Sequence, residues 1–168
     1  MIQFRNAEVQ DIPQIRELAF AIWPQAYAKI LTAEQSHYML EMMYSPESLF
    51  RQMDVQQHRF IIACENDSAV GFASWSFTKE THIYKLHKIY VLPDKQGGGI
   101  GKKLINQVIA DIGSSVSAIL ELNVNRFNNA KEFYSRLGFK VVREVDIAIG
   151  NGFFMNDYVM QKSIGTNV

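Results

Sequence analysis

The sequence predicts an α/β domain, of the α+β type, with a mixed and mostly antiparallel sheet of six to seven strands and helices on both faces. Two observations support this. Apolar residues recur at helical spacing up to about residue 55 and alternate with a period of two after it. One strand-helix-strand segment, residues 86 to 124, has the length of a crossover between parallel neighbours, whereas most other connections are short enough for hairpins.

The N-terminal segment predicts a short strand over residues 2–8 and then a helix. Asp11 is the expected N-cap, with Pro13 in the first turn. The apolar face of this helix consists of Ile12, Ile15, Leu18, Ala19 and Ile22. We expect Trp23-Pro24 to end or bend the helix, because proline disfavours helical geometry in the preceding residue.

Two further helices are expected before the sheet resumes. Thr32 opens a capping-box pattern, and Ser45-Pro46 places proline at the first position of a short third helix. Their apolar positions are Tyr38, Met39, Met42, Met43, Leu49, Phe50 and Met53. Core packing accounts for these residues better than a cofactor site does.

The remaining chain alternates strands with two helices. Strands are expected at residues 59–65, 69–77, 82–92, 117–124, 140–148 and 153–161. Residues 66–68 form a turn, and Asn151-Gly152 joins the last two strands. Helices are expected at residues 99–112 and 128–137, the second ended by Gly138.

The amino-acid composition excludes several classes of function. The chain has 168 residues, which we assign to a single domain spanning 1–168. Seventeen basic residues balance seventeen acidic ones, which argues against a nucleic-acid partner. Cys64 is the only cysteine, so an internal disulfide and a thiolate metal cluster are excluded and no metal is expected. Without a signal-like start or a membrane-length apolar run, we expect a cytoplasmic protein with no membrane partner.

The most informative segment is the glycine-rich loop at residues 96–101, which leaves a strand and opens a helix. Glycines permit close approach of a ligand to the backbone, and the free N–H groups at a helix start favour an anion. Lys102 and Lys103 add positive charge. The loop therefore predicts a phosphate or pyrophosphate site. The spacing fits neither a Walker A loop nor a dinucleotide fingerprint, because Gly97 and Gly101 have only three residues between them and the loop follows several strands.

The segment Gln96-Gly97-Gly98-Gly99-Ile100-Gly101 resembles the Gln/Arg-x-x-Gly-x-Gly/Ala signature of the GNAT superfamily of N-acetyltransferases. The resemblance implies that the loop holds the pyrophosphate of acetyl-CoA. It also implies that residues 86–92 form the central strand, whose backbone pairs with the pantetheine arm where a bulge or splay frees it from its neighbour. The N-terminal part, Trp23 to Gln52, is in addition similar to bacterial polyamine (spermidine/spermine) N-acetyltransferases.

A second motif, residues 125–139, resembles the family pattern Asn-x-x-Ala-x-x-Phe-Tyr-x-x-x-Gly-Phe. The resemblance implies that Tyr134 points at the thioester sulfur and that an asparagine touches the CoA arm. Phe127 stands where the family carries that asparagine, so Asn128 is our assignment and Asn129 the reserve. Taken from the residues alone, Tyr134 is a core tyrosine and Asn128 a helix cap. The expected cofactor-binding residues are Ile89, Tyr90, Val91, Gln96, Gly97, Gly98, Gly99, Ile100, Gly101, Lys102, Asn128 and Tyr134.

Direct acetyl transfer requires a neutral amine, an oxyanion donor and an acid for the leaving thiolate. A backbone N–H of the stretch 89–91 is the expected donor. Tyr134 is the expected acid, since a tyrosine pKa of about 10 keeps it protonated at neutral pH. His87 is the leading candidate base, on the argument that it shares strand parity with Ile89 and Val91. Glu80, His82, Glu121, a base acting through water, or no base remain open.

These features together predict an acetyl-CoA-dependent N-acetyltransferase that acts by direct attack of a small primary amine, with a polyamine as one option. Acetyl-CoA and this amine are the expected partners, and a homodimer is possible. The alternatives are acetylation of a protein N-terminus or lysine, and a CoA-binding regulatory module without turnover.

Overall fold

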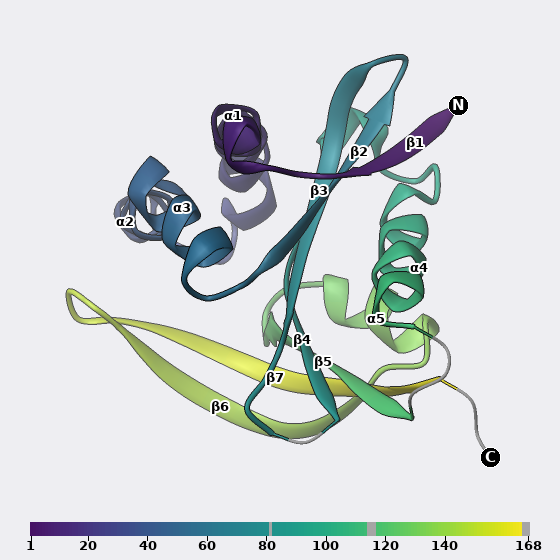
Figure 1. Ribbon diagram of the computed structural model, residues 1–168. Helices are drawn as coiled ribbons and strands as arrows, with labels where there is room; N and C mark the ends of the chain where they lie inside the picture. Colours follow the sequence, from purple (N-terminus) through teal and green to yellow (C-terminus); the bar gives the residue numbers. More distant parts are fainter. Residues whose placement is uncertain (81, 114–116, 166–168) are drawn as a thin grey trace.

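The computed structural model describes residues 1–80, 82–113 and 117–165. Within them, seven strands form one sheet in the order β1-β2-β3-β4-β5-β7-β6 (Figure 1). The strands are β1 Ile2–Asn6, β2 Arg59–Glu65, β3 Ser68–Phe77, β4 Ile83–Val91, β5 Ala118–Asn125, β6 Lys140–Gly150 and β7 Phe153–Ile164. The helices are α1 Ile12–Tyr27, α2 Ala33–Tyr44, α3 Pro46–Asp54, α4 Ile100–Ile112 and α5 Ala130–Arg136. The predicted fold class and element order are confirmed.

Strand β4 is parallel to β5, and each of the other five pairings is antiparallel. The parallel pair is joined by α4, which is the expected crossover. The β6–β7 hairpin turns at Asn151 and Gly152, whose φ angles of 53° and 76° suit a tight turn of the predicted kind. This topology places the one parallel junction in the middle of the sheet.

Two cores lie on opposite faces of the sheet. In Figure 1, α1, α2 and α3 stand on one side, and α4 and α5 on the other. Strand β2 serves both cores because successive side chains alternate: Phe60 and Ile62 pack against α1–α3, whereas Ile61 and Ala63 pack against α4. We call these the α1–α3 face and the α4 face. The site described below lies between them.

The short helices begin where the sequence predicts, at side-chain caps. The Thr32 hydroxyl accepts a hydrogen bond from the Gln35 N–H at 3.1 Å, and the Ser45 hydroxyl accepts one from the Ser48 N–H at 3.2 Å. Each cap satisfies one of the N–H groups that a helix start leaves free.

Of the two expectations for Trp23-Pro24, an end or a bend of the helix, the end is wrong, because α1 continues through Pro24 to Tyr27. Trp23 and Tyr27 are both buried, and their rings are 4.3 Å apart. Burial of these two aromatic side chains compensates for the backbone hydrogen bond that proline cannot make.

The N-terminus differs in two smaller respects. Strand β1 ends at Asn6 rather than residue 8, because a 3₁₀ turn begins at Val9. The Asp11 side chain makes no capping bond to α1; it accepts hydrogen bonds from Arg5 at 2.8 and 2.9 Å and from the Glu8 N–H at 2.8 Å. Asp11 therefore ties the helix start to β1.

Three further expectations are corrected by the packing. Met42 and Phe50, expected in the core, are 39% and 45% exposed, because the buried faces of α2 and α3 are formed by other residues, among them Met39, Leu40, Tyr44 and Leu49. Helix α5 begins at Ala130 rather than residue 128, since Asn128 lies in a turn, and its side-chain oxygen accepts a hydrogen bond from the Ala130 N–H at 2.9 Å.

In the described ranges, no helix is long and apolar enough to cross a membrane.

Replacing Gly71 by alanine tests how closely β3 must approach β4. An added Cβ would lie 2.6 Å from the Tyr90 carbonyl oxygen, so the backbone of β4 would have to shift. We expect Gly71→Ala to destabilise the fold by ~1–3 kcal/mol in urea denaturation. Gly98→Ala is the matched control, because a Cβ there comes no closer than 3.9 Å to a neighbour. Equal stability of the two variants would contradict the close approach.

Candidate active site

The site begins where β4 and β5 part. Their parallel pairing covers Ile83–Leu86 and Ile119–Leu122, although β4 continues to Val91 and β5 to Asn125. On its other side β4 stays paired with β3 as far as Val91. The last five residues of β4 therefore present one edge to the gap between the two strands. The family resemblance noted in the sequence implies such a separation of the two strands.

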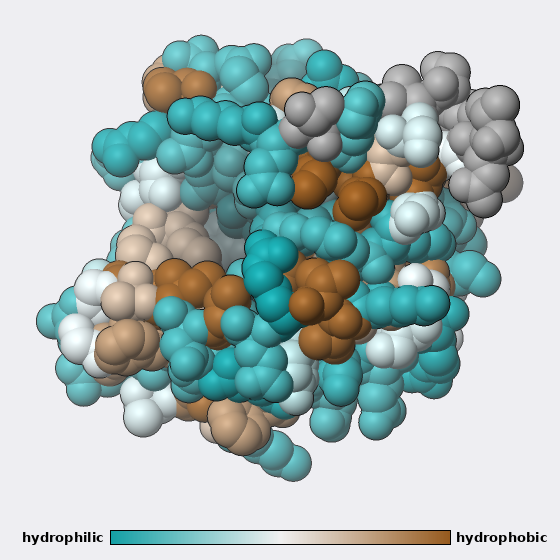
Figure 2. Space-filling model, turned by 90° about the horizontal axis from the view of Figure 1, so that it is seen from below, coloured by the Kyte–Doolittle hydropathy of each residue, from teal (hydrophilic) through white to brown (hydrophobic). Residues whose placement is uncertain are grey.

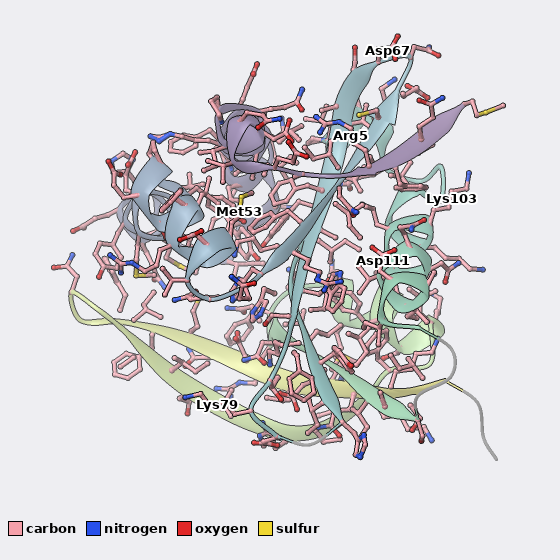
Figure 3. All side chains as sticks on the ribbon, viewed as in Figure 1. Arg5, Met53, Asp67, Lys79, Lys103 and Asp111 are labelled. Carbon is pink, nitrogen blue, oxygen red and sulfur yellow. The ribbon has the colours of Figure 1, made fainter. Side chains whose placement is uncertain are left out.

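The glycine-rich loop follows directly after β4. Gly97 and Gly99 have φ angles of 84° and 79°, which favour glycine, and an added Cβ at either would meet open space. Gly99 is the N-cap of α4, so the first N–H groups of that helix lack intrahelical acceptors. Lys102 and Lys103 are exposed, and Figure 3 shows Lys103 pointing away from the sheet near this end of α4. The loop is thus an open, electropositive cradle.

Two predicted loop residues have structural contacts of their own. The Gln96 amide donates to the Val91 carbonyl at 3.1 Å, which fixes the loop to the end of β4. A Cβ on Gly101 would lie 3.2 Å from the Phe133 ring, so this glycine permits close packing of α4 against α5. That packing sets the position of the next residue, Tyr134.

Tyr134 belongs to a group of buried tyrosines around the gap. Its ring packs between Phe133 and Phe139, with centroids 5.3 and 5.9 Å away. Burial, with a smaller effect of Tyr27, raises the pKa of Tyr134 above its usual range. The Tyr27 and Tyr90 hydroxyls are 3.0 Å apart. Tyr134 is consequently a protonated hydroxyl at neutral pH, as an acid requires.

Strand parity predicted that His87 shares a face with Ile89 and Val91, and this prediction is wrong. A β-bulge between Leu86 and Lys88 shifts the register, so Ile89 and Val91 pack on the α4 face while His87 turns to Ser76 on the α1–α3 face. Its Nε2 lies 2.7 Å from the Ser76 hydroxyl.

The His87 ring also stacks on His58, with centroids 3.8 Å apart. Desolvation where the ring packs on its neighbours, followed by the charges of His58, Lys88 and Lys85, lowers the pKa of His87, although the residue as a whole is exposed. His87 is therefore neutral at physiological pH and a weak proton acceptor.

Lys88 is a buried lysine that the sequence did not single out. Its ammonium donates to the Gln52 side-chain oxygen at 2.7 Å and lies over the rings of Tyr44 and Phe60. Burial lowers the pKa of Lys88 to about 8. A lysine amid a strand of apolar neighbours was the available signal, but it is equally typical of an exposed strand.

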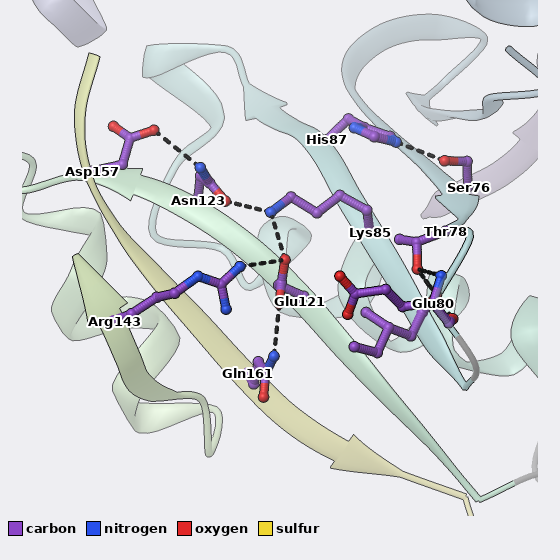
Figure 4. Close-up of polar contacts among 11 residues, drawn as sticks. Ser76, Thr78, Glu80, Lys85, His87, Glu121, Asn123, Arg143, Asp157 and Gln161 are labelled. Atoms are coloured by element: carbon purple, nitrogen blue, oxygen red, sulfur yellow. Dashed lines mark hydrogen bonds and ion pairs between the residues drawn. The ribbon is translucent and has the colours of Figure 1, made fainter. Parts of the chain in front are cut away.

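A chain of polar side chains crosses β4, β5 and β7 on the α1–α3 face (Figure 4). Glu121, a candidate base, is fully engaged in it: it accepts from Lys85 at 3.0 Å and from Gln161 at 2.6 Å and pairs with Arg143. Burial acts to raise the pKa of Glu121, but these bonds and charges outweigh it and lower the pKa. Glu121 therefore holds this group of polar side chains together.

Asp157 lies at the other end of this chain. Its Oδ2 accepts from Asn123 at 3.4 Å, and Asn123 in turn accepts from Lys85. Asp157 is only 6% exposed, and no described side chain or backbone group donates to its Oδ1. Burial raises the pKa of Asp157, opposed by the bond from Asn123 and the charges of Lys85 and Arg126. The sequence signal for Asp157 was a carboxylate within the alternating pattern of a buried strand.

Two of the other sequence candidates lie away from the gap. Glu80 and His82 are exposed at the turn between β3 and β4, the end of β4 opposite to the glycine-rich loop. Asn128 and Asn129 lie at the start of α5, and Asn128 is engaged with the Ala130 N–H. Within the described ranges, no group of three or more His, Cys, Asp or Glu side chains could hold a metal ion.

The α1–α3 face is bounded by a contact between α2 and the β6–β7 hairpin. The Tyr38 hydroxyl donates to the Ile149 carbonyl at 2.9 Å, and the Gln35 amide donates to the Phe154 carbonyl at 3.1 Å. Seen from below in Figure 2, the surface is hollowed in its left half, and both brown apolar and teal polar side chains border the hollow. The helices α2 and α3 and the hairpin lie on this side of the molecule (Figure 1).

Comparison with known proteins identifies the fold and family. The model of the GNAT acetyltransferase domain family matches residues 27–162. An uncharacterized N-acetyltransferase of Methanocaldococcus jannaschii is 38% identical over 142 residues, which is 81% of this chain and 59% of that relative. The chain thus spans about three fifths of that relative's length.

A curated relative and a solved structure from Thermoplasma acidophilum are also similar. A spermidine N(1)-acetyltransferase is 27% identical over 147 residues, 83% of this chain and 89% of the relative. The crystal structure of PaiA N-acetyltransferase in complex with coenzyme A has a TM-score of 0.78 and 24% identity, and covers 97% of this chain and 99% of that one. This structural likeness shows the fold.

The buried lysine generates a pH-dependent stability prediction. Because the pKa of Lys88 is lowered to about 8 in the folded state, the unfolded chain binds more protons between pH 8 and 10, and stability attributable to Lys88 rises over that window. We expect Lys88→Met to remove roughly 2 kcal/mol of this rise. Urea denaturation of parent and variant at pH 7 and pH 10 measures the difference. If the free energies of unfolding of parent and Lys88→Met differed by the same amount at pH 7 and at pH 10, the lowered pKa of Lys88 would be contradicted.

Proposed function

Since the chain belongs to the GNAT acetyltransferase domain family, we propose that it transfers the acetyl group of acetyl-CoA to a primary amine of a small molecule by direct attack of the amine. The observation that carries this proposal is the gap between β4 and β5, which leaves the edge of residues 87–91 unpaired on the β5 side and leads into the glycine-rich loop. An extended ligand arm with an anion at one end fits that arrangement.

The residues at the gap fit acetyl-CoA in three places. The open loop from Gln96 to Lys102 would receive the pyrophosphate through backbone N–H groups. The edge formed by Ile89, Tyr90 and Val91 would pair with the pantetheine arm, and Asn128, just before α5, would contact that arm. The co-substrate supplies the activated acyl group, and these residues bind and orient it.

The chemistry asks two things of the chain. A backbone N–H of the stretch 89–91 would donate to the oxyanion, and Tyr134 would protonate the departing sulfur. The raised pKa of Tyr134 keeps its proton available at neutral pH. His87 was the expected base, but its low pKa and its bond to Ser76 favour a role in holding the β4 bulge.

A small acceptor is favoured over a protein by the closed end of the α1–α3 face. The bonds from Tyr38 and Gln35 tie α2 to the β6–β7 hairpin, which obstructs the continuous groove that a peptide needs. Similarity to a spermidine N(1)-acetyltransferase keeps polyamines among the candidate acceptors. Turnover itself distinguishes an enzyme from a CoA-binding regulatory module.

Thermal unfolding with acetyl-CoA tests the loop assignment. A ligand that binds only the folded state raises the melting temperature by mass action, and we expect this shift in the parent. Gly99→Val should abolish it by filling the cradle. Gly113→Val is the matched control: Gly113 at the other end of α4 also has a positive φ and open space around it, so the variant suffers similar backbone strain. Loss of the shift in both variants, or in neither, would argue against the assignment.

Tyr134→Phe tests the transfer step. We expect kcat to fall by about 10²-fold or more while the thermal shift with acetyl-CoA is retained, because the hydroxyl acts mainly in the transition state. Release of CoA thiol with spermidine, spermine, short monoamines and a peptide as acceptors measures turnover. If only the peptide is acetylated, the small-molecule proposal fails; if no acceptor is, turnover itself is refuted. A lower melting temperature with unchanged kcat would leave Tyr134 as a core residue.

A further inference from the structure

We infer that the Asp157 carboxylate binds the ammonium of the acceptor and takes its proton before attack, so that Asp157 is a catalytic residue of the proposed transfer. The inference rests on the proposed function and adds to it the proton acceptor. Asp157 carries it because, among the described residues near the gap, it is a buried carboxylate with one oxygen that no donor satisfies. A buried, unsatisfied carboxylate oxygen is costly unless a ligand donor completes it.

The sheet register places Asp157 at the right level. It pairs with Asn125, three residues beyond the last β5 residue that pairs with β4. Asn125 lies in the part of β5 that continues beyond its pairing with β4 and borders the gap. Asp157, on the neighbouring strand β7, therefore lies next to the end of β5 that borders the gap.

The alternation of side chains places Asp157 on the opposite face from Tyr134. Tyr158 and Met160 pack in the α4 core together with Tyr134, so Asp157, between strand neighbours of the other parity, points to the α1–α3 face. The negative charge of Asp157 contributes to the raised pKa of Tyr27. The Tyr27 hydroxyl bonds that of Tyr90, and Tyr27 in turn contributes to the raised pKa of Tyr134. The acid and the proton acceptor thus approach the gap from opposite faces.

The charged side chains around Asp157 have other partners, and none of them donates to its Oδ1. Lys85 from β4 is held by Glu121 and Asn123, and Arg126 after β5 is paired with Asp146 and Glu144. Tyr27 from α1 is the other titratable neighbour, and burial raises its pKa, so it stays neutral. Burial also raises the pKa of Asp157, which brings the carboxylate closer to the basicity that a proton acceptor needs at neutral pH.

The protons balance with these two residues. An ammonium N–H bond breaks and its proton goes to Asp157 Oδ1. The freed lone pair forms the N–C bond and the C–S bond breaks, with the sulfur taking the Tyr134 proton. The nitrogen's second proton restores Tyr134, and Asp157 releases its proton to water. The products are the amide, CoA thiol and one proton.

Asp157→Asn tests the inference, with Asp146→Asn as the control because it removes one exposed carboxylate from the same hairpin. At pH 7 we expect kcat/KM to fall by about 10²–10⁴-fold in Asp157→Asn and little in Asp146→Asn. The deficit should shrink toward pH 10, where the free amine forms in solution. Asp157→Glu should recover part of the activity.

Stability separates this role from a structural one. Because the amide replaces a buried, incompletely bonded carboxylate, we expect the melting temperature of Asp157→Asn at pH 7 to rise, by about 2–4 °C, and the acetyl-CoA shift to persist. A parent-like pH profile, or a lower melting temperature with proportional loss of activity at every pH, would overturn the inference. A parent that acetylates no amine would instead refute the proposed function.

Discussion

The separation of β4 from β5 after Leu86 is the constraint on which the rest of the site depends. A parallel pair held together along its whole length would use the β4 edge for hydrogen bonds within the sheet, and nothing could enter between the strands. Two features keep the strands apart. The bulge at His87 changes the direction of β4, and the glycine-rich loop carries the chain away to α4. The gap is therefore built into the backbone.

Buried polar groups accumulate around this gap. Three tyrosines, one lysine and one aspartate lie there with limited exposure: Tyr27, Tyr90, Tyr134, Lys88 and Asp157. Their pKa values move in the direction that disfavours charge, since each group has lost solvent. Such a cluster is expensive for a folded protein, and shifted pKa values are typical of active sites.

The sequence predicted the fold well and the site unevenly, for a physical reason. Periodicity, caps such as Thr32 and Ser45, and turn residues are local signals, so element order and the crossover through α4 followed from them. Packing signals are not local. Pro24 inside α1, exposed Phe50 and the bulge that turned His87 to the other face all depend on neighbours distant in the sequence.

Asp157 illustrates the limit most clearly. In the sequence it is one acidic residue among seventeen, in a strand with no motif around it. Only the register with Asn125 brings it to the level of the gap, and only the structure shows that its Oδ1 is buried without a donor. Tyr134, by contrast, could be identified from a sequence motif, because the residues next to it in α5 belong to the same motif. A residue supplied by a different strand from its functional partners leaves no local pattern.

The two faces of the sheet give this arrangement a chemical logic. Amine attack requires a proton to leave nitrogen early and another to reach sulfur late, and one group performing both tasks would need its pKa matched to each. With Tyr134 on the α4 face and Asp157 on the α1–α3 face, burial raises the pKa of both, which keeps the tyrosine protonated and makes the carboxylate more basic. In the proposed transfer, the same loss of solvent would therefore prepare an acid on one side of the gap and a proton acceptor on the other.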